Sequence, residues 1–82
     1  MIITNNHDIM ANKKTLLARY KRLENENLHN DCAILLVKNF GTQEELERIN
    51  SIRAKHMERG HILYEEQKER MEISQKYYKE LF

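Results

Sequence analysis

The chain contains no proline or tryptophan, and only two of its 82 residues are glycines, Gly41 and Gly60. Because proline and glycine are the usual residues of tight turns and helix breaks, their scarcity disfavours a turn-rich β architecture. The single cysteine, Cys32, cannot form an intramolecular disulfide, which is typical of a protein in a reducing compartment. The length allows one domain at most. We therefore expect a single small, all-α domain over residues 1–82, located in the cytoplasm.

Long apolar runs and an excess of charge of one sign are also absent. The longest apolar run, residues 32–37, is far shorter than the about 20 residues that cross a bilayer. The apolar start at residues 1–4 is too short for the hydrophobic segment of a secretory leader, and no basic segment comes before it. Fourteen basic and 13 acidic residues give a net charge of +1, which favours no class of partner. We expect no membrane association. The richness in Asn, Lys, Glu and Ile is compatible with a phage or a mobile element.

The N-terminal half predicts two helices. Apolar residues recur at threes and fours from His7 to Leu28, which indicates an amphipathic helix capped by Asn5 or Asn6. The residues at 25–31 are rich in Asn and Asp, which compete with the helical backbone, and they predict a break.

The segment Asp31–Phe40 is ambiguous, because six consecutive apolar residues suit a buried strand or a buried helix equally well. A lone strand would need a pairing partner, and only residues 1–4 resemble a second strand. We favour a short buried helix that is capped by Asn30 or Asp31 and ends at Gly41 in the left-handed conformation.

The C-terminal half begins with the sharpest local signal of the chain. Thr42 and Glu45 have the spacing of a capping box, which predicts a helix start at Gln43. From there to Phe82 the apolar residues share one arc about 160° wide, and only Ile62 and Ile73 fall on the polar side. Gly60 costs about 1 kcal/mol against alanine inside a helix. Because the apolar stripe keeps its phase across Gly60, we favour one long C-terminal helix (about 43–82), with a bend or a break at Gly60 as the alternative.

The length of this helix implies a partner. About 40 helical residues extend about 60 Å, and the first helix extends only about 33 Å, so the chain cannot cover the segment 64–82. An exposed apolar stripe of that size indicates an interface. We expect a helical bundle with a coiled-coil-like homodimer, or a complex with another protein. The alternative is a break at Gly60 that folds the last segment back as a monomeric bundle. The expected partner-binding residues are Tyr64, Met71, Tyr77, Tyr78, Leu81 and Phe82.

Two groups of charged residues could bind anions. The segment Lys13–Arg22 carries five positive charges and no acid, but the charges spread around the helix as on a solvated face. A second group interrupts the apolar stripe and includes Gln67 and Arg70. Arginine stems that cover apolar surface explain this group most simply. The sharper hypothesis is a pocket for a phosphate or nucleotide. The candidate anion-binding residues are Lys13, Lys14, Arg19, Lys21, Arg22, Arg53, His56 and Arg59.

The sequence supports catalysis and metal binding less than it supports anion binding. His29 and Cys32, with His56 and His61, loosely resemble zinc-ligand spacing, but Cys32 begins an apolar run and the last two point about 140° apart on a continuous helix. The glutamates are spaced as a solvated face, and no glycine-rich loop positions a nucleophile. A helix-turn-helix over 31–52 would place acidic residues against phosphates. We expect no enzyme, no cofactor and no metal.

The sequence therefore favours a non-enzymatic small helical regulator, adaptor or inhibitor that acts by protein–protein interaction. The alternative is a binding module for a nucleotide, another anionic ligand or nucleic acid, using Lys13–Arg22 or the cluster of Arg53 and Arg59.

Overall fold

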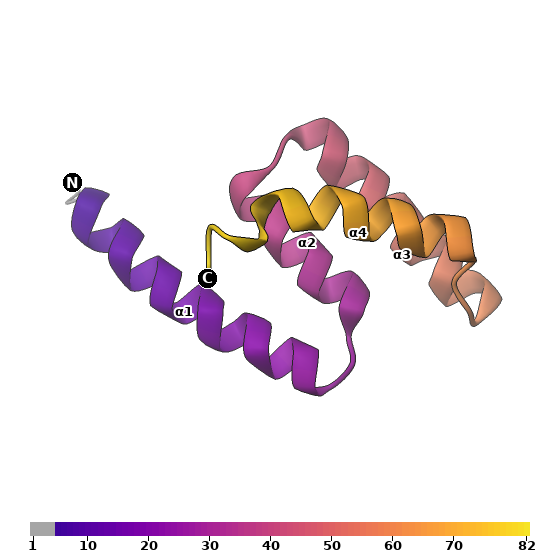
Figure 1. Ribbon diagram of the computed structural model, residues 1–82, viewed down its shortest axis with the longest axis horizontal. Coiled ribbons are helices and arrows are strands. Elements are labelled where there is room, and N and C mark those ends of the chain that lie inside the picture. Colours follow the sequence, from indigo (N-terminus) through magenta and orange to yellow (C-terminus); the bar gives the residue numbers. More distant parts are fainter. Residues whose placement is uncertain (1–4) are drawn as a thin grey trace.

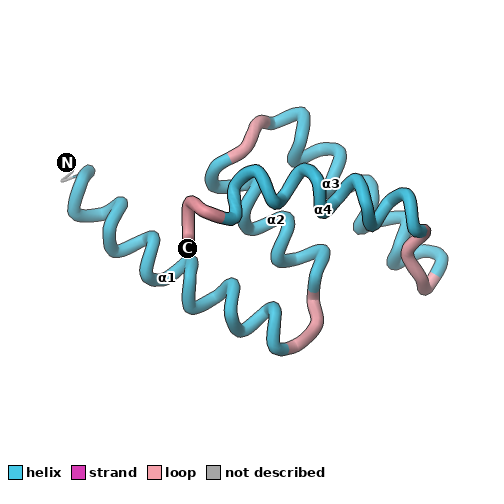
Figure 2. Tube along the Cα trace, viewed as in Figure 1, coloured by secondary structure: helices cyan, strands magenta, loops and turns pink. Residues whose placement is uncertain are grey.

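The computed structural model describes the backbone of residues 5–82 and the side chains of residues 13–82. This part of the chain contains four helices and no strand (Figures 1 and 2). They are α1 (Asn5–Asn25), α2 (His29–Phe40), α3 (Gln43–Arg59) and α4 (Tyr64–Tyr78). The all-α prediction is confirmed. None of the described helices is long and apolar enough to cross a membrane.

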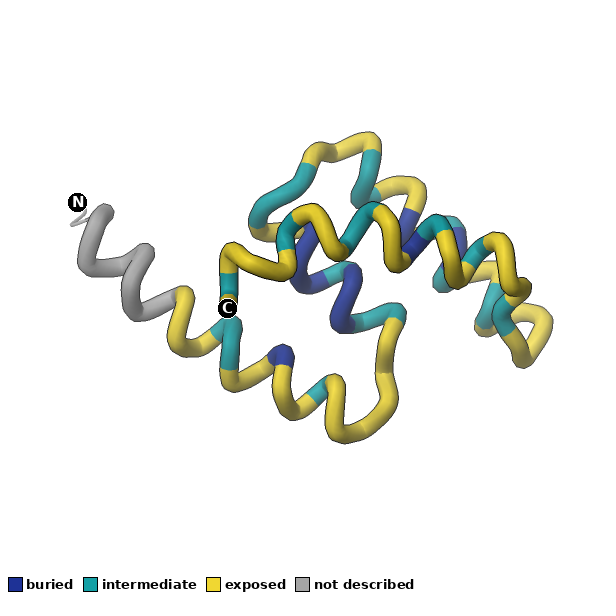
Figure 3. Tube along the Cα trace, in the orientation of Figure 1, coloured by how far each residue is buried: buried dark blue, intermediate teal, exposed yellow. Residues whose placement is uncertain are grey.

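The short helix α2 is the centre of the fold, because it packs against each of the other three helices. The ambiguous run at 32–37 is helical, and Figure 3 shows the buried residues concentrated there. Leu36 and Val37 each expose only 1% of their surface. Burying a side chain of this size contributes about 1.5–3 kcal/mol. The run is apolar on all sides because neighbouring helices surround it, which is why periodicity could not identify it.

The core has two parts that meet on α2. Tyr20 of α1 packs with Cys32, Leu35 and Leu36 in the first part. Ile49 of α3 packs with residues 33 and 37 in the second, and partly buried side chains of α4 close it. The two parts therefore join α2 to α1 on one side and to α3 and α4 on the other.

The turn between α1 and α2 depends on Asn27, which adopts the left-handed conformation with φ 60°. The amide of Leu28 donates to the carbonyl of Leu23, and the amide of Asn27 donates to that of Glu24, a Schellman motif. Leu28 then occupies the N-cap of α2 without a side-chain cap, so the predicted cap at Asn30 or Asp31 is wrong. Both residues lie inside α2 instead.

The ends of α1 and α2 differ in detail from the predictions. Asn5 and Asn6 are already part of α1, and the residue that caps this helix lies outside the described residues. Gly41 ends α2 as predicted, but in an extended conformation with φ −98°, so the predicted left-handed turn is wrong. A Cβ at Gly41 would approach Glu45 Oε1 to 2.9 Å and Tyr77 Cε2 to 3.0 Å. Glycine is therefore suited to this position by close packing.

The capping box at the start of α3 is confirmed. The amide of Glu45 donates to Thr42 Oγ1 at 3.1 Å, and the amide of Thr42 donates to Glu45 Oε1 at 2.9 Å. The same carboxylate also binds Lys76 and accepts a hydrogen bond from the Tyr77 hydroxyl on α4. One residue thus both caps α3 and fastens α4 to it.

The predicted long C-terminal helix is wrong, because the chain breaks at Gly60. This residue has φ +85° and its amide donates to the carbonyl of His56 at 2.8 Å, which ends α3. Glycine adopts this conformation without the steric cost that a Cβ would add. The chain reverses over residues 60–63, and α4 packs back against α2 and α3 (Figure 1). Folding back packs part of each half of the apolar stripe within one chain, including Ile49, Ile52 and Tyr77, so the length of an uninterrupted helix no longer argues for a dimer.

Candidate functional site

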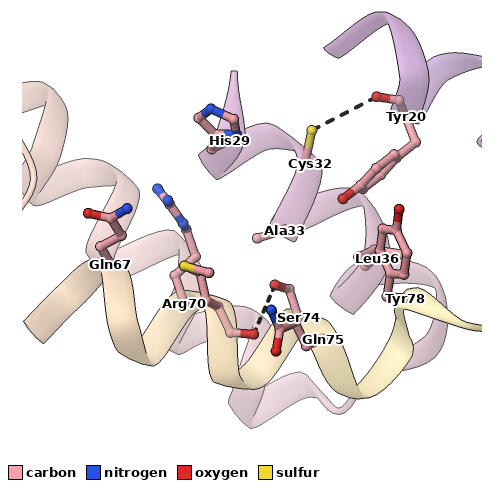
Figure 4. Close-up of a pocket in the computed structure, with 11 residues that line it drawn as sticks. Tyr20, His29, Cys32, Ala33, Leu36, Gln67, Arg70, Ser74, Gln75 and Tyr78 are labelled. Carbon is pink, nitrogen blue, oxygen red and sulfur yellow. Dashed lines mark hydrogen bonds between the residues drawn. The ribbon is translucent and has the colours of Figure 1, made fainter. Parts of the chain in front are cut away.

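A pocket of about 600 Å³ opens between α1, α2 and α4. The helices α1 and α4 both pack on α2, and they touch each other only through side chains such as Tyr20 and Tyr78, which leaves space between them. Figure 4 shows the guanidinium of Arg70 directed toward His29 at one end, with the rings of Tyr20 and Tyr78 at the other. The lining residues are Tyr20, His29, Cys32, Ala33, Leu36, Gln67, Arg70, Met71, Ser74, Gln75 and Tyr78.

Arg70 is the one charged residue that is buried within the described side chains, and it exposes 7% of its surface. Its Nη1 donates to Asn30 Oδ1 at 2.8 Å, and the amide nitrogen of Asn30 lies 2.8 Å from His56 Nδ1. Burial lowers the pKa of Arg70, but a guanidinium stays protonated at any physiological pH. The described residues place no carboxylate within ion-pair distance of Arg70. A buried positive charge therefore stands without a partner of opposite charge.

The other arginines near the helix junctions are neutralised. Arg53 donates to Asp31 at 3.0 Å, and Arg59 lies 2.5 Å from Glu66. Arg48 makes a bidentate contact with Glu69, with distances of 2.6 and 2.8 Å.

The predicted anion cluster is only partly assembled. Arg53 and His56 line a second, smaller cavity of about 340 Å³ together with Arg70, and Arg59 lies outside that cavity. Because Arg53 and Arg59 already bind carboxylates, Arg70 is the better candidate for an external anion.

The remaining titratable groups of the large pocket include two that are neutral. Burial raises the pKa of Tyr20 to about 12, and burial followed by the nearby Glu24 carboxylate raises the pKa of Cys32 to about 11. The Cys32 thiol lies 3.9 Å from the carbonyl oxygen of Tyr20 and is not a reactive thiolate. No acidic residue lines the pocket among the described residues.

A separate feature is the apolar end, which we define as Leu28, Met57, Ile62, Leu63 and Tyr64. Leu28, Met57 and Ile62 border the same small cavity, and residues 63 and 64 follow directly in the chain. Tyr64 exposes 77% of its surface and Met57 exposes 67%. Three helices meet here, and the chain leaves these side chains uncovered. Met57 and Leu63 were expected on the apolar stripe of a continuous helix, and the break at Gly60 leaves them exposed instead.

The predicted partner-binding residues separate into two groups. Tyr77 and Leu81 pack against the core of their own chain. Tyr78 and Phe82 stack on each other with ring centroids 4.2 Å apart, and each meets the edge of Tyr20. Tyr64 and Met71 remain exposed, as do Tyr78 and Phe82 in part. Of the six, Tyr64 therefore has the strongest claim to an interface.

The five cations of the basic segment of α1 are all exposed. The ion pairs of the described residues include none of its five cations. Tyr20 is buried and Leu16 and Leu23 are partly buried, so the core-facing side of α1 is fixed. At about 100° per residue, three of the five cations fall on the opposite side, and they are Lys14, Lys21 and Arg22. Lys13 and Arg19 lie at the two flanks of the core-facing side.

The loose zinc pattern of the sequence is not assembled. Within the described residues, no group of three or more His, Cys, Asp or Glu side chains could hold a metal ion. His56 binds Asn30, and Cys32 is buried in the core beside Tyr20.

Comparison of the chain with known protein families, with curated proteins and with solved structures finds no match.

Proposed function

We propose that this protein is a non-enzymatic helical module that binds another protein chain through its apolar end. The main observation is the exposure of Met57, which borders a cavity lined by α2, α3 and α4, and of Tyr64, which begins α4 two residues after Ile62 of the same cavity. Large apolar side chains gathered on one surface indicate an interface, whereas single exposed ones do not. Tyrosine and methionine are also enriched in the buried centre of interfaces.

Self-association is the simplest form of this function, because a two-fold dimer needs only one surface that is complementary to itself. The α3–α4 corner would lie at the dimer axis and Tyr64 would contact its counterpart. The stripe first expected to dimerise is largely replaced by this smaller surface, since α4 folds back on α2.

Light scattering over a wide concentration range tests the self-associating form. The wild-type mass should rise from that of the 10.0 kDa chain toward twice that value, and Tyr64→Ser with Met57→Ser should remain monomeric. Glu47→Ser, which changes an exposed residue of α3 away from this corner, is the matched control. A monomer at near-millimolar concentration would rule out the homodimer.

Photo-crosslinking tests the function for any protein partner. A photoreactive phenylalanine analogue at Tyr64 should give a discrete crosslinked species in cells, and the same analogue at Glu47 should not. Equal crosslinking from both positions, or none from position 64, would contradict the proposal.

A second candidate function is contact with nucleic acid through the basic side of α1. It is favoured by three exposed cations, Lys14, Lys21 and Arg22, on one side of α1, where phosphates could approach. Binding to random DNA or RNA that weakens steeply with salt, and that Lys21→Gln with Arg22→Gln weakens further, would support it. No binding at low salt would exclude it.

A further inference from the structure

The pocket between α1, α2 and α4 combines a buried charge with space for a ligand. Arg70 uses one N–H group for Asn30, and the described residues offer no acceptor to its remaining N–H groups. No fully buried side-chain nitrogen lacks a partner in this part of the chain, so those groups reach solvent in the cavities that Arg70 lines. A guanidinium in this setting favours an anion, because burial has removed water that would otherwise stabilise its charge.

The surroundings of Arg70 increase this preference. His29 is the first residue of α2 and lines the same end of the pocket. The first turn of α2 has no side-chain cap, and such a turn carries unpaired amides and a partial positive charge. At the opposite end Glu24 acts on Tyr20 and Cys32. The first turn of α2 also carries Asp31, but this carboxylate pairs with Arg53, so Arg70 is the cation toward which a negative group in the pocket is directed.

The size and lining of the pocket define the ligand. A volume of about 600 Å³ lies within the roughly 300–1,000 Å³ typical of small-molecule sites. Ala33 lies between the charged end and the aromatic end in Figure 4, and Leu36 and Met71 also line the pocket with apolar surface. One guanidinium matches a carboxylate through two parallel hydrogen bonds, whereas nucleotides are usually held by several cations. Arg53 and Arg59 are not free for that purpose.

We propose that this pocket binds a small organic monocarboxylate, whose charged group pairs with Arg70 and whose apolar body lies against Leu36 and Met71. The large pocket shares Arg70 with the small cavity that the apolar end borders, but the proposed ligand lies on the side of Leu36 and does not depend on a protein partner.

Titration of the wild-type chain followed by nuclear magnetic resonance tests the proposal, with octanoate and phenylacetate as probes. Saturable shifts are expected at the methyl groups of Ala33, Leu36 and Met71, and the methyl of Ile52 on α3 should stay unchanged. The neutral amides of the two probes should bind at least about tenfold more weakly, because a hydrogen-bonded charge contributes about 1.5–3 kcal/mol. Amides that bind as tightly as the acids would overturn the proposal.

Variants identify the group that binds the charge. Arg70→Met should weaken octanoate binding about tenfold or more. Arg48→Gln is the matched control, because it removes the same charge from an exposed ion pair outside the pocket. Unchanged binding by Arg70→Met would overturn the proposal. If that variant does not fold, the comparison of acids with amides on the wild-type chain still tests whether the pocket prefers a carboxylate.

The location and class of the anion have separate tests. Inorganic phosphate and adenosine monophosphate should perturb the pocket methyls only weakly. Tighter Arg70-dependent binding of either one would overturn the assignment to carboxylates. Shifts confined to Lys14 and Arg22 would also overturn it, because the probes would then bind the exposed face of α1.

Discussion

The two sides of α4 are held by different kinds of contact. Toward α3, polar bridges connect the helices, including Glu45 with Lys76 and Tyr77, and Arg48 with Glu69. Toward α1, the contacts are between aromatic rings at one end, and a pocket separates the two helices along the rest. Directed contacts fix a helix pair at short distance, whereas a few ring edges leave room between the helices. The closed side therefore supports the fold, and the open side is where a ligand can enter.

The largest expected effect comes from emptying the closed side of the core. Ile49 is fully buried, and Ile49→Ala should cost about 2–5 kcal/mol of unfolding free energy through lost apolar contacts and a new cavity. That is a large share of the roughly 4–12 kcal/mol expected for a chain of this size. Leu36→Ala should cost less, because Leu36 borders a pocket that already exists. Urea denaturation measures both. An equal or larger loss for Leu36→Ala would contradict the distinction between the two sides.

Gly60→Ala should have an intermediate effect, because it strains the reversal that brings α4 back onto α2. A Cβ at this position would meet nothing within 4 Å, so the cost comes only from φ +85°. Placing an L-residue there costs roughly 1–2 kcal/mol. Thermal and urea unfolding measure it, with the exposed helical position Glu58→Ala as control. A continuous helix through Gly60 would give the opposite sign, since alanine stabilises a helix interior by about 1 kcal/mol over glycine.

The smallest expected effect is a pH dependence on the closed side. Hydrogen bonds from Lys76, then Tyr77, then the Thr42 amide lower the pKa of Glu45 to about 2 from its usual 4.5. A folded-state pKa below the unfolded one contributes stability above about pH 4.5, which is lost as the pH falls toward 2. Arginine partners also lower the pKa of Glu66 and Glu69, so Glu45→Gln should flatten the acid limb only in part. Unfolding free energy at a series of pH values measures this, with Glu47→Gln as control. If the loss of unfolding free energy at low pH is the same in Glu45→Gln as in the wild type, the contacts of Glu45 with α4 do not contribute to stability.

Local signals in the sequence predicted local structure well. Thr42 and Glu45 identified the start of α3 because a capping box involves four neighbouring residues and little else. The Asn-rich segment correctly marked the turn after α1, although the cap was placed two or three residues late. Gly41 was correctly predicted to end a helix, whereas a break at Gly60 was only the alternative to the favoured continuous helix. The left-handed conformation predicted for Gly41 is wrong, because the choice between extended and left-handed backbone depends on what packs beside the turn.

The candidate sites were predictable only in part. Gln67 and Arg70 were visible as polar residues within an apolar stripe, which is the pattern that a buried charge produces. Ile73 was assigned to the polar side, yet it packs against the core, because the reversal at Gly60 gives α4 its own rotation about its axis. The same reversal exposed Met57 and Leu63. One wrong prediction at Gly60 therefore led to wrong predicted environments for several other residues.

The sequence by itself determined the helical class, the break before α2, the end of α2 at Gly41 and the buried run of α2, because these follow from propensity, capping and apolar composition along a short stretch of chain. Only the tertiary structure decided which arginine lacks a carboxylate and which apolar residues remain uncovered. Arg53, Arg59 and Arg70 look alike in the sequence, and their differences arise from pairing across 7 to 40 positions. Such pairing depends on the path of the chain, which a helical wheel does not contain.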